Sequence, residues 1–78
     1  MASTPSVVLF HAQGCHLCDR AREVLDRVGV AYESVDITGR PELEARYREW
    51  LPVVEIDGAR AFVYYVDESA LRRKVSQT

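Results

Sequence analysis

The chain has few cysteines, no long apolar segment and no strongly basic region, and each absence excludes a class of protein. Only two of its 78 residues are cysteine, which excludes a framework of several disulfides. The stretch 1–6 has neither a basic region nor a long apolar run, so we expect a short tail, not a signal peptide or a membrane span. The net charge is −2, and basic residues cluster only at Arg72, Arg73 and Lys74. We therefore expect no nucleic-acid partner and no membrane partner.

The low cysteine content also limits what the pair can contribute to stability. A composition of 47% hydrophobic and 28% charged residues predicts one small globular domain over residues 1–78. We expect it to be a cytoplasmic monomer, since a cysteine pair of this kind suits a reducing compartment. A disulfide between the two cysteines would enclose two residues, and so short a loop constrains the unfolded chain little. A chemical role therefore explains the cysteine pair better than a stabilising cross-link does.

Residues 14–18, which read Gly-Cys-His-Leu-Cys, hold both cysteines. They follow an apolar run at 7–10 that predicts a buried strand, and they precede a helical stripe of apolar residues that begins at Leu17. Two thiols three positions apart at a helix start can close a disulfide with little movement of the backbone. The helix end also lowers the pKa of the first thiol. A strand, a Cys-x-x-Cys segment and a helix in this order predict a redox site.

Periodicity and turn signals predict seven elements along the chain. Gly29 stops the first helix, and Pro41 suits the first turn of the second. The second helix ends ahead of Pro52, because the residue before a proline is pushed out of the α region. Asp57-Gly58 predicts a β-hairpin. The predicted strands are 7–10, 30–37, 53–56 and 61–66, and the predicted helices are 17–28, 41–50 and one that opens at 67–69.

The resulting order is β-α-β-α-β-β-α, which belongs to the α/β class. An initial βαβ unit needs a right-handed crossover and makes a parallel pair. The closing hairpin adds antiparallel strands to the same sheet, so we predict a four-stranded mixed sheet flanked by helices. Tyr47 and Trp50 are expected to cover that sheet. Of Tyr64 and Tyr65, on alternate faces of the last predicted strand, one is expected in the core and the other at the surface.

This order resembles the glutaredoxin branch of the thioredoxin fold, with Cys15-His16-Leu17-Cys18 after the first strand and Pro52 opening the third. The resemblance covers nearly the whole chain. It implies that Cys15 is the nucleophile of a thiol–disulfide oxidoreductase and that Cys18 resolves the mixed disulfide. It also implies that Pro52 follows a cis peptide bond and that Leu51 offers its backbone to the substrate.

Two positions depart from the glutaredoxin pattern. Ala12 stands three positions before the nucleophile, where glutaredoxins commonly carry a basic residue. Residues 64–69, Tyr-Tyr-Val-Asp-Glu-Ser, contain no glycine, where glutaredoxins carry a Gly-Gly pair followed by Asp that holds the glutathione carboxylate. Without these glycines the backbone approaches a ligand less readily. We therefore expect no bound cofactor, with glutathione or a thioredoxin-reductase-type protein as the electron donor.

The expected mechanism is dithiol exchange with a disulfide-containing protein. The Cys15 thiolate attacks the target, and Cys18 then attacks the mixed disulfide and leaves the pair oxidised. His16 and Leu17 lie between the thiols, and we expect both to contact the substrate and to tune the redox potential. An imidazolium at His16 favours the thiolate form of Cys15.

Two other functions remain compatible with the residues. The Cys-x-x-Cys segment could ligate zinc or an iron–sulfur cluster at a dimer interface, because one chain does not offer four well-placed ligands. Alternatively, the chain could be an interaction domain that keeps the fold and does not catalyse a reaction. His11, at the end of the first predicted strand, is expected to be a capping or surface histidine.

Overall fold

The computed structural model describes residues 5–76 of the chain, so residues 1–4 of the predicted tail lie outside the described residues. Within the described residues, eight elements follow one another. They are β1 (Val7–His11), α1 (His16–Val28), β2 (Glu33–Asp36), α2 (Pro41–Tyr47), the 3₁₀ turn η1 (Arg48–Trp50), β3 (Val53–Ile56), β4 (Ala59–Val63) and α3 (Glu68–Val75).

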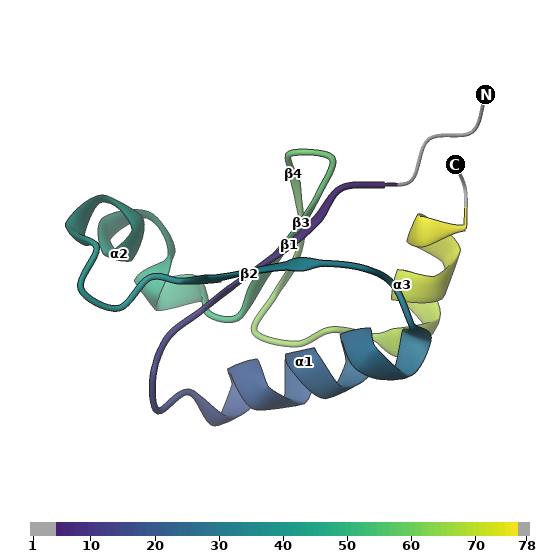
Figure 1. Cartoon of the computed structure of the whole chain (residues 1–78), viewed down its shortest axis with the longest axis horizontal. Coiled ribbons are helices and arrows are strands. Elements are labelled where there is room, and N and C mark those ends of the chain that lie inside the picture. The colour runs from purple at the N-terminus through teal and green to yellow at the C-terminus, as the bar shows by residue number, and fades with distance from the viewer. Residues whose placement is uncertain (1–4, 77–78) are drawn as a thin grey trace.

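The four strands form one mixed sheet in the order β2-β1-β3-β4 (Figure 1). β1 lies parallel to β2, with Leu9 opposite Ser34, and antiparallel to β3, with Leu9 opposite Val54. β3 and β4 are antiparallel. The predicted α/β class and the mixed sheet are confirmed, and the crossover through α1 makes the parallel pair.

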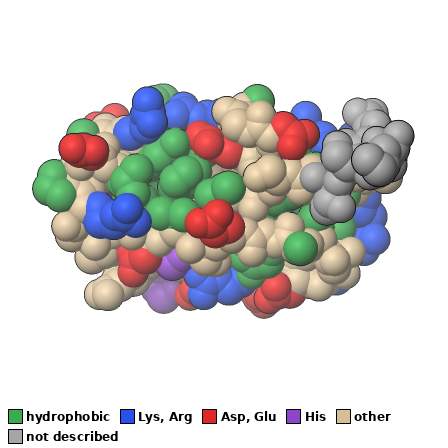
Figure 2. Space-filling model, turned by 45° about the horizontal axis from the view of Figure 1, so that its top comes forward, with side chains coloured by type: hydrophobic (Ala, Val, Ile, Leu, Met, Phe, Trp, Pro, Cys, Tyr) green, Lys and Arg blue, Asp and Glu red, His purple; other side chains and the backbone are tan. Residues whose placement is uncertain are grey.

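The two faces of the sheet bury separate cores. Alternate side chains of β1 point to opposite faces, so Val7 and Leu9 pack with α1 and α3, whereas Phe10 packs with α2. α2 lies over one end of its face (Figure 1), and hydrophobic side chains are visible over the strands beside it (Figure 2). The core against α1 and α3 is thus more fully covered.

Helix α1 positions the cysteines, and its two ends are well defined. Gly29 caps its C-terminus with a φ of 82°, and the Gly29 N–H donates to the Leu25 carbonyl. Leu25 is fully buried in the core shared with α3. Arg27 also bonds Glu68 of α3 at 2.8 Å. These contacts fix the helix that carries Cys18 against the sheet.

Three predicted boundaries need correction. The strand expected at 30–37 pairs only over Glu33–Asp36, and the helix expected at 41–50 ends at Tyr47 and continues as η1. The last strand, expected at 61–66, spans Ala59–Val63 instead, and it ends there because Tyr64 turns the chain with a φ of 65°. By contrast, the hairpin turn is where it was predicted, with φ positive at both Asp57 and Gly58.

Within residues 5–76, no helix is both long and apolar enough to cross a membrane.

Candidate active site

The two cysteines are joined by a disulfide at the start of α1, with their Cα atoms 5.2 Å apart. Cys15 is the N-cap residue of the helix, in an extended backbone conformation. The Cys18 N–H donates to the Cys15 Sγ at 3.1 Å, and the Asp19 N–H donates to the Cys15 carbonyl at 3.3 Å. Cys15 therefore occupies the place where a helix presents unpaired amides to a capping acceptor.

The two sulfurs differ in their access to solvent. Cys15 is half-buried, whereas Cys18 is only 2% exposed. The residues between them face outward: His16 is exposed, and Leu17 is 49% exposed. An incoming group therefore meets Cys15, His16 and Leu17 before the buried Cys18.

Leu51 and Pro52, which the resemblance predicts to form a platform for the substrate, lie between η1 and β3. The Leu51–Pro52 peptide bond is cis, in agreement with the resemblance. Pro52 is buried and Leu51 is half-buried. Among the described residues, no backbone hydrogen bond outside the helices and strands involves Leu51, which directly follows η1 as its C-cap residue.

Tyr64 connects this platform to the end of β4. Its N–H is shared by the Pro52 carbonyl at 2.9 Å and the Trp50 carbonyl at 3.3 Å. The Tyr65 N–H donates to the Val63 carbonyl at 2.7 Å, which closes a three-residue γ-turn around Tyr64. A φ of 65° is uncommon for a residue with a side chain. The backbone here thus takes a glycine-like conformation at a tyrosine.

Both tyrosines project to the surface as a result. Tyr64 is 46% exposed and Tyr65 is 71% exposed. The prediction that one of them enters the core is wrong, because the strand alternation on which it rested stops at Val63. Val66, the next residue, is the one that packs into the core with α1 and α3.

An aromatic and cationic cluster supports the platform from the side of α2. Tyr47 is buried, its ring stacks on Phe10 at 4.1 Å between centroids, and its hydroxyl donates to Glu55 at 2.9 Å. Burial, followed by this hydrogen bond, raises the pKa of Tyr47. The Arg60 guanidinium lies 5.9 Å from the ring centres of both Tyr47 and Trp50.

Trp50 departs in part from its predicted role. It is 40% exposed, and its ring lies 5.9 Å from that of Tyr64, so it extends the exposed aromatic surface next to Leu51. Tyr47, the other predicted sheet-covering residue, is in the core as expected.

His11 ends β1 opposite Asp36 of β2. Burial lowers the pKa of His11, and the charge of Arg22 acts in the same direction, while Asp36 and Asp19 oppose them. The Thr38 N–H donates to Asp36 at 2.9 Å and lowers the pKa of that carboxyl. Burial and the charge of Arg22 outweigh the two carboxylates and favour the uncharged imidazole of His11. Within residues 5–76, no group of three or more His, Cys, Asp or Glu side chains is placed to hold a metal ion.

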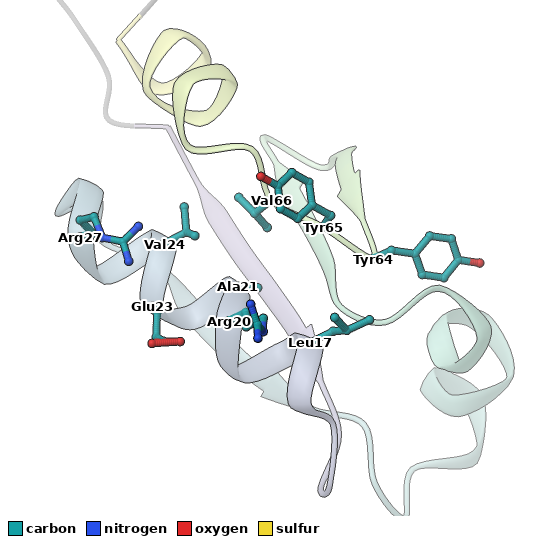
Figure 3. Close-up of a pocket in the computed structure, with 9 residues that line it drawn as sticks. All are labelled: Leu17, Arg20, Ala21, Glu23, Val24, Arg27, Tyr64, Tyr65 and Val66. Carbon is teal, nitrogen blue, oxygen red and sulfur yellow. The ribbon is translucent and has the colours of Figure 1, made fainter.

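A groove of about 480 Å³ runs along α1 (Figure 3). Leu17, Ala21 and Val24 line it from the helix, and the segment 64–66 forms the opposite wall. Arg20, Glu23 and Arg27 complete the lining. Neither cysteine lines the groove, but Leu17, which lies between the two cysteines in the sequence, does.

The predicted site residues therefore fall into two groups. Cys15, Cys18, His16 and Leu17 are together at the start of α1. Leu51 and Pro52 are connected to the groove wall through the backbone of Tyr64.

The sequence did not identify Arg20, Arg60 or the turn at Tyr64 as parts of this region. The helical spacing of Arg20 from Leu17 was the available signal for the groove. The turn had no signal, because a positive φ is usually marked by glycine or asparagine.

Comparison with known proteins gives a family match over most of the chain. A family model described as "Glutaredoxin-like domain (DUF836)" matches residues 6–76. An uncharacterized protein of Mycobacterium tuberculosis is 33% identical over 85 aligned residues, which cover 97% of this chain and 88% of that protein. A glutaredoxin of Pseudomonas aeruginosa is 39% identical over 41 residues, 53% of this chain and 49% of that protein.

Solved structures show the same fold. The X-ray structure of a structural-genomics target protein from X. campestris has a TM-score of 0.80 at 30% identity, covering 94% of this chain and 99% of that one. Glutaredoxin 1 from Francisella tularensis has a TM-score of 0.67 at 16% identity, covering 95% and 99%. The second likeness supports the thioredoxin-like fold alone.

Proposed function

The chain belongs to this glutaredoxin-like family, and we propose that it is a thiol–disulfide oxidoreductase that reduces protein disulfides. The observation that carries the proposal is the Cys15–Cys18 pair at the start of α1, with one accessible and one buried sulfur. This asymmetry suits an attacking and a resolving thiol.

The helix start favours the reactive form of Cys15. In the reduced protein, a thiolate at the N-cap accepts the Cys18 N–H, which already donates to this sulfur at 3.1 Å. The positive end of the α1 macrodipole acts in the same direction. An unperturbed thiol has a pKa of about 8.5, and a helix N-terminus lowers it toward or below neutrality. The fraction of thiolate at neutral pH rises accordingly.

Reduction of a target then proceeds in two exchanges. The Cys15 thiolate attacks one target sulfur, forms a mixed disulfide and releases the other target sulfur as a thiolate. The Cys18 thiolate next attacks the Cys15 Sγ, closes the intramolecular disulfide and releases the second target thiolate. The target gains two electrons and the Cys15–Cys18 pair loses two. The nearly complete burial of Cys18 delays its role until Cys15 has reacted.

Leu51 and Pro52 serve as the platform for the target. The backbone carbonyl of Leu51, a residue in extended conformation after η1, accepts a hydrogen bond from extended backbone beside the target cysteine. His16 and Leu17 contact the target from the other side of the thiols. We propose no bound cofactor. Glutathione or a thioredoxin-reductase-type protein, acting in the cytoplasm, returns the two electrons.

The test uses the reduced protein, a disulfide-linked model peptide and each of two candidate donors. Wild type should reduce the peptide and turn over with one donor, whereas Cys15→Ser should lower the rate at least about a thousandfold, because no second accessible nucleophile replaces it. Cys18→Ser serves as the matched variant and should stop after one exchange. Equal peptide reduction by wild type and Cys15→Ser would contradict the proposal.

A further inference from the structure

We propose that the groove along α1 is a subsite for the polypeptide that flanks the target cysteine, and that Arg20 binds a carboxylate of that polypeptide. The inference rests on the proposed function and names the substrate class more closely. An acidic residue next to an apolar one, two or three positions from the reacting cysteine, is the expected occupant.

The charges around the groove single out Arg20. Two arginines and one glutamate line the groove, so it carries net positive charge in a chain whose net charge is −2. Arg27 is already paired with Glu68 at 2.8 Å, and Glu68 also accepts from Arg72. The Arg20 guanidinium, in contrast, makes no hydrogen bond or ion pair within the part of the chain that the structure describes.

Glu23, the one acidic lining residue, forms no ion pair with Arg20 among the described residues. Figure 3 shows the Glu23 carboxylate pointing away from the segment 64–66, whereas Leu17 and Val24 point toward it. Arg20 and Val24 are separated by one turn of α1, so the Arg20 guanidinium lies next to the apolar side of the groove that Leu17, Ala21 and Val24 form. A ligand in the groove thus meets an apolar surface with an unpaired guanidinium at its edge.

The dimensions favour a polypeptide over a smaller thiol. From Leu17 to Arg27 the groove follows α1 for roughly 15 Å at 1.5 Å per residue. An extended chain covers that length in about four or five residues. Arg20 lies five residues beyond Cys15, about 7 Å along the helix axis. A carboxylate two or three extended residues from the target cysteine therefore reaches it.

The wall opposite α1 suits an apolar neighbour of that acid. Tyr65, at 71% exposed, presents a phenol ring with few contacts of its own, and Val66 closes the base of the groove. Because Tyr64 is held by the carbonyls of Trp50 and Pro52, this wall is tied to the platform that pairs with the target backbone. Backbone pairing at Leu51 and side-chain recognition in the groove can occur together.

Synthetic peptides of about five residues test the subsite. Each carries one cysteine linked by a disulfide to a chromogenic thiol, an adjacent leucine, and either Glu or Gln two or three positions away, on either side of the cysteine. The reduced protein should cleave the best Glu peptide with a kcat/KM about two- to fivefold above its Gln partner at low salt, the range of an exposed ion pair. High salt should reduce the preference.

Arg20→Gln should abolish this preference, and Arg20→Lys should retain part of it. Arg73→Gln is the matched control, because Arg73 is exposed on α3 and does not line the groove; it should keep the preference. Equal rates for Glu and Gln peptides with wild type, or a preference unaffected by Arg20→Gln, would overturn the subsite.

Binding without chemistry separates this inference from the proposed function. Peptides with Ser in place of Cys are titrated into the oxidised protein while the NMR shifts of α1 and 64–66 are followed. Glu-dependent binding that Arg20→Gln removes, together with no turnover of any peptide, would support the subsite and contradict the redox function. Turnover at equal rates for Glu and Gln peptides, together with binding that does not depend on Glu, would support the redox function and contradict the subsite.

Discussion

The thiol half and the platform half of the site are built in different ways. In the thiol half, Cys15, Cys18 and their hydrogen bond lie within one turn of α1. In the platform half, the segment 50–52 and the turn at Tyr64 are distant in the sequence and are joined by tertiary hydrogen bonds. The reacting groups are thus a local property of the chain, while recognition depends on its packing.

The platform half also depends on a separate core. Tyr47, Phe10 and Val53 belong to the cluster on the α2 face, whereas α1 and α3 pack on the other face with Leu9 and Leu25. A change in one core should therefore affect one half of the site more than the other.

The largest effect is expected at Tyr47, in the core beneath the platform. Tyr47→Ala removes a buried ring stacked on Phe10 and should lower the free energy of unfolding by about 3–5 kcal/mol. Tyr47→Phe loses only the hydrogen bond to Glu55 and should lower it by about 1 kcal/mol. Urea denaturation measures both values.

Tyr47→Phe also tests the separation of the two halves. Its folded form should react with an alkylating agent at Cys15 at the wild-type rate, because the start of α1 does not depend on this hydrogen bond. Tyr65→Ala, which removes an exposed ring, should change stability by no more than about 0.5 kcal/mol. If Cys15 is alkylated more slowly in Tyr47→Phe than in wild type, the thiol half and the platform half are not independent.

A smaller effect of opposite sign is expected at Tyr64. A side chain at a φ of 65° costs about 1–3 kcal/mol, and glycine relieves that strain at an entropic cost of about 0.4–1 kcal/mol. Allowing for the lost contact with Trp50, Tyr64→Gly should raise the free energy of unfolding by up to about 1 kcal/mol. Tyr65→Gly, at a residue without positive φ, should lower it. If Tyr64→Gly and Tyr65→Gly lower the free energy of unfolding equally in urea denaturation, the turn at Tyr64 carries no strain.

The smallest effect is expected in the thiol half, at His16. His16→Val removes an imidazole that can carry a positive charge next to Cys15 and should raise the pKa of Cys15 by less than about one pH unit, because His16 is exposed to solvent and ions. Thiolate absorbance followed against pH in a Cys18→Ser background measures it. Leu17→Ala, which removes no charge, is the control. Identical titration curves for His16→Val and its parent would exclude His16 from the activation of Cys15.

The sequence predicted the thiol half well and the platform half in part. Helical periodicity, Gly29 and the cysteine spacing are local signals, and α1 and its disulfide are where these signals placed them. The cis bond before Pro52 was available only through the resemblance. Asp57-Gly58 marked the hairpin, because its preferred conformation has positive φ at both residues.

The end of β4 could not be predicted from propensity. Residues 61–66 are continuously apolar or aromatic and so favour a strand, yet the strand ends at Val63, since Tyr64 adopts a φ of 65° and shares its N–H between the carbonyls of Pro52 and Trp50. The groove wall and the exposure of Tyr65 both follow from that turn. A chain segment whose hydrogen-bond partners lie in another part of the sequence gives no local signal of its conformation.

The central claim is that Cys15 attacks and Cys18 resolves, and trapping of the mixed disulfide tests it most directly. The reduced Cys18→Ser and Cys15→Ser variants are each mixed with a disulfide-linked peptide, and the protein mass is measured before and after reduction. The account predicts a stable adduct of one peptide chain at Cys15 in Cys18→Ser and almost none in Cys15→Ser. An adduct that forms at Cys18 as readily as at Cys15, or in neither variant, would contradict it.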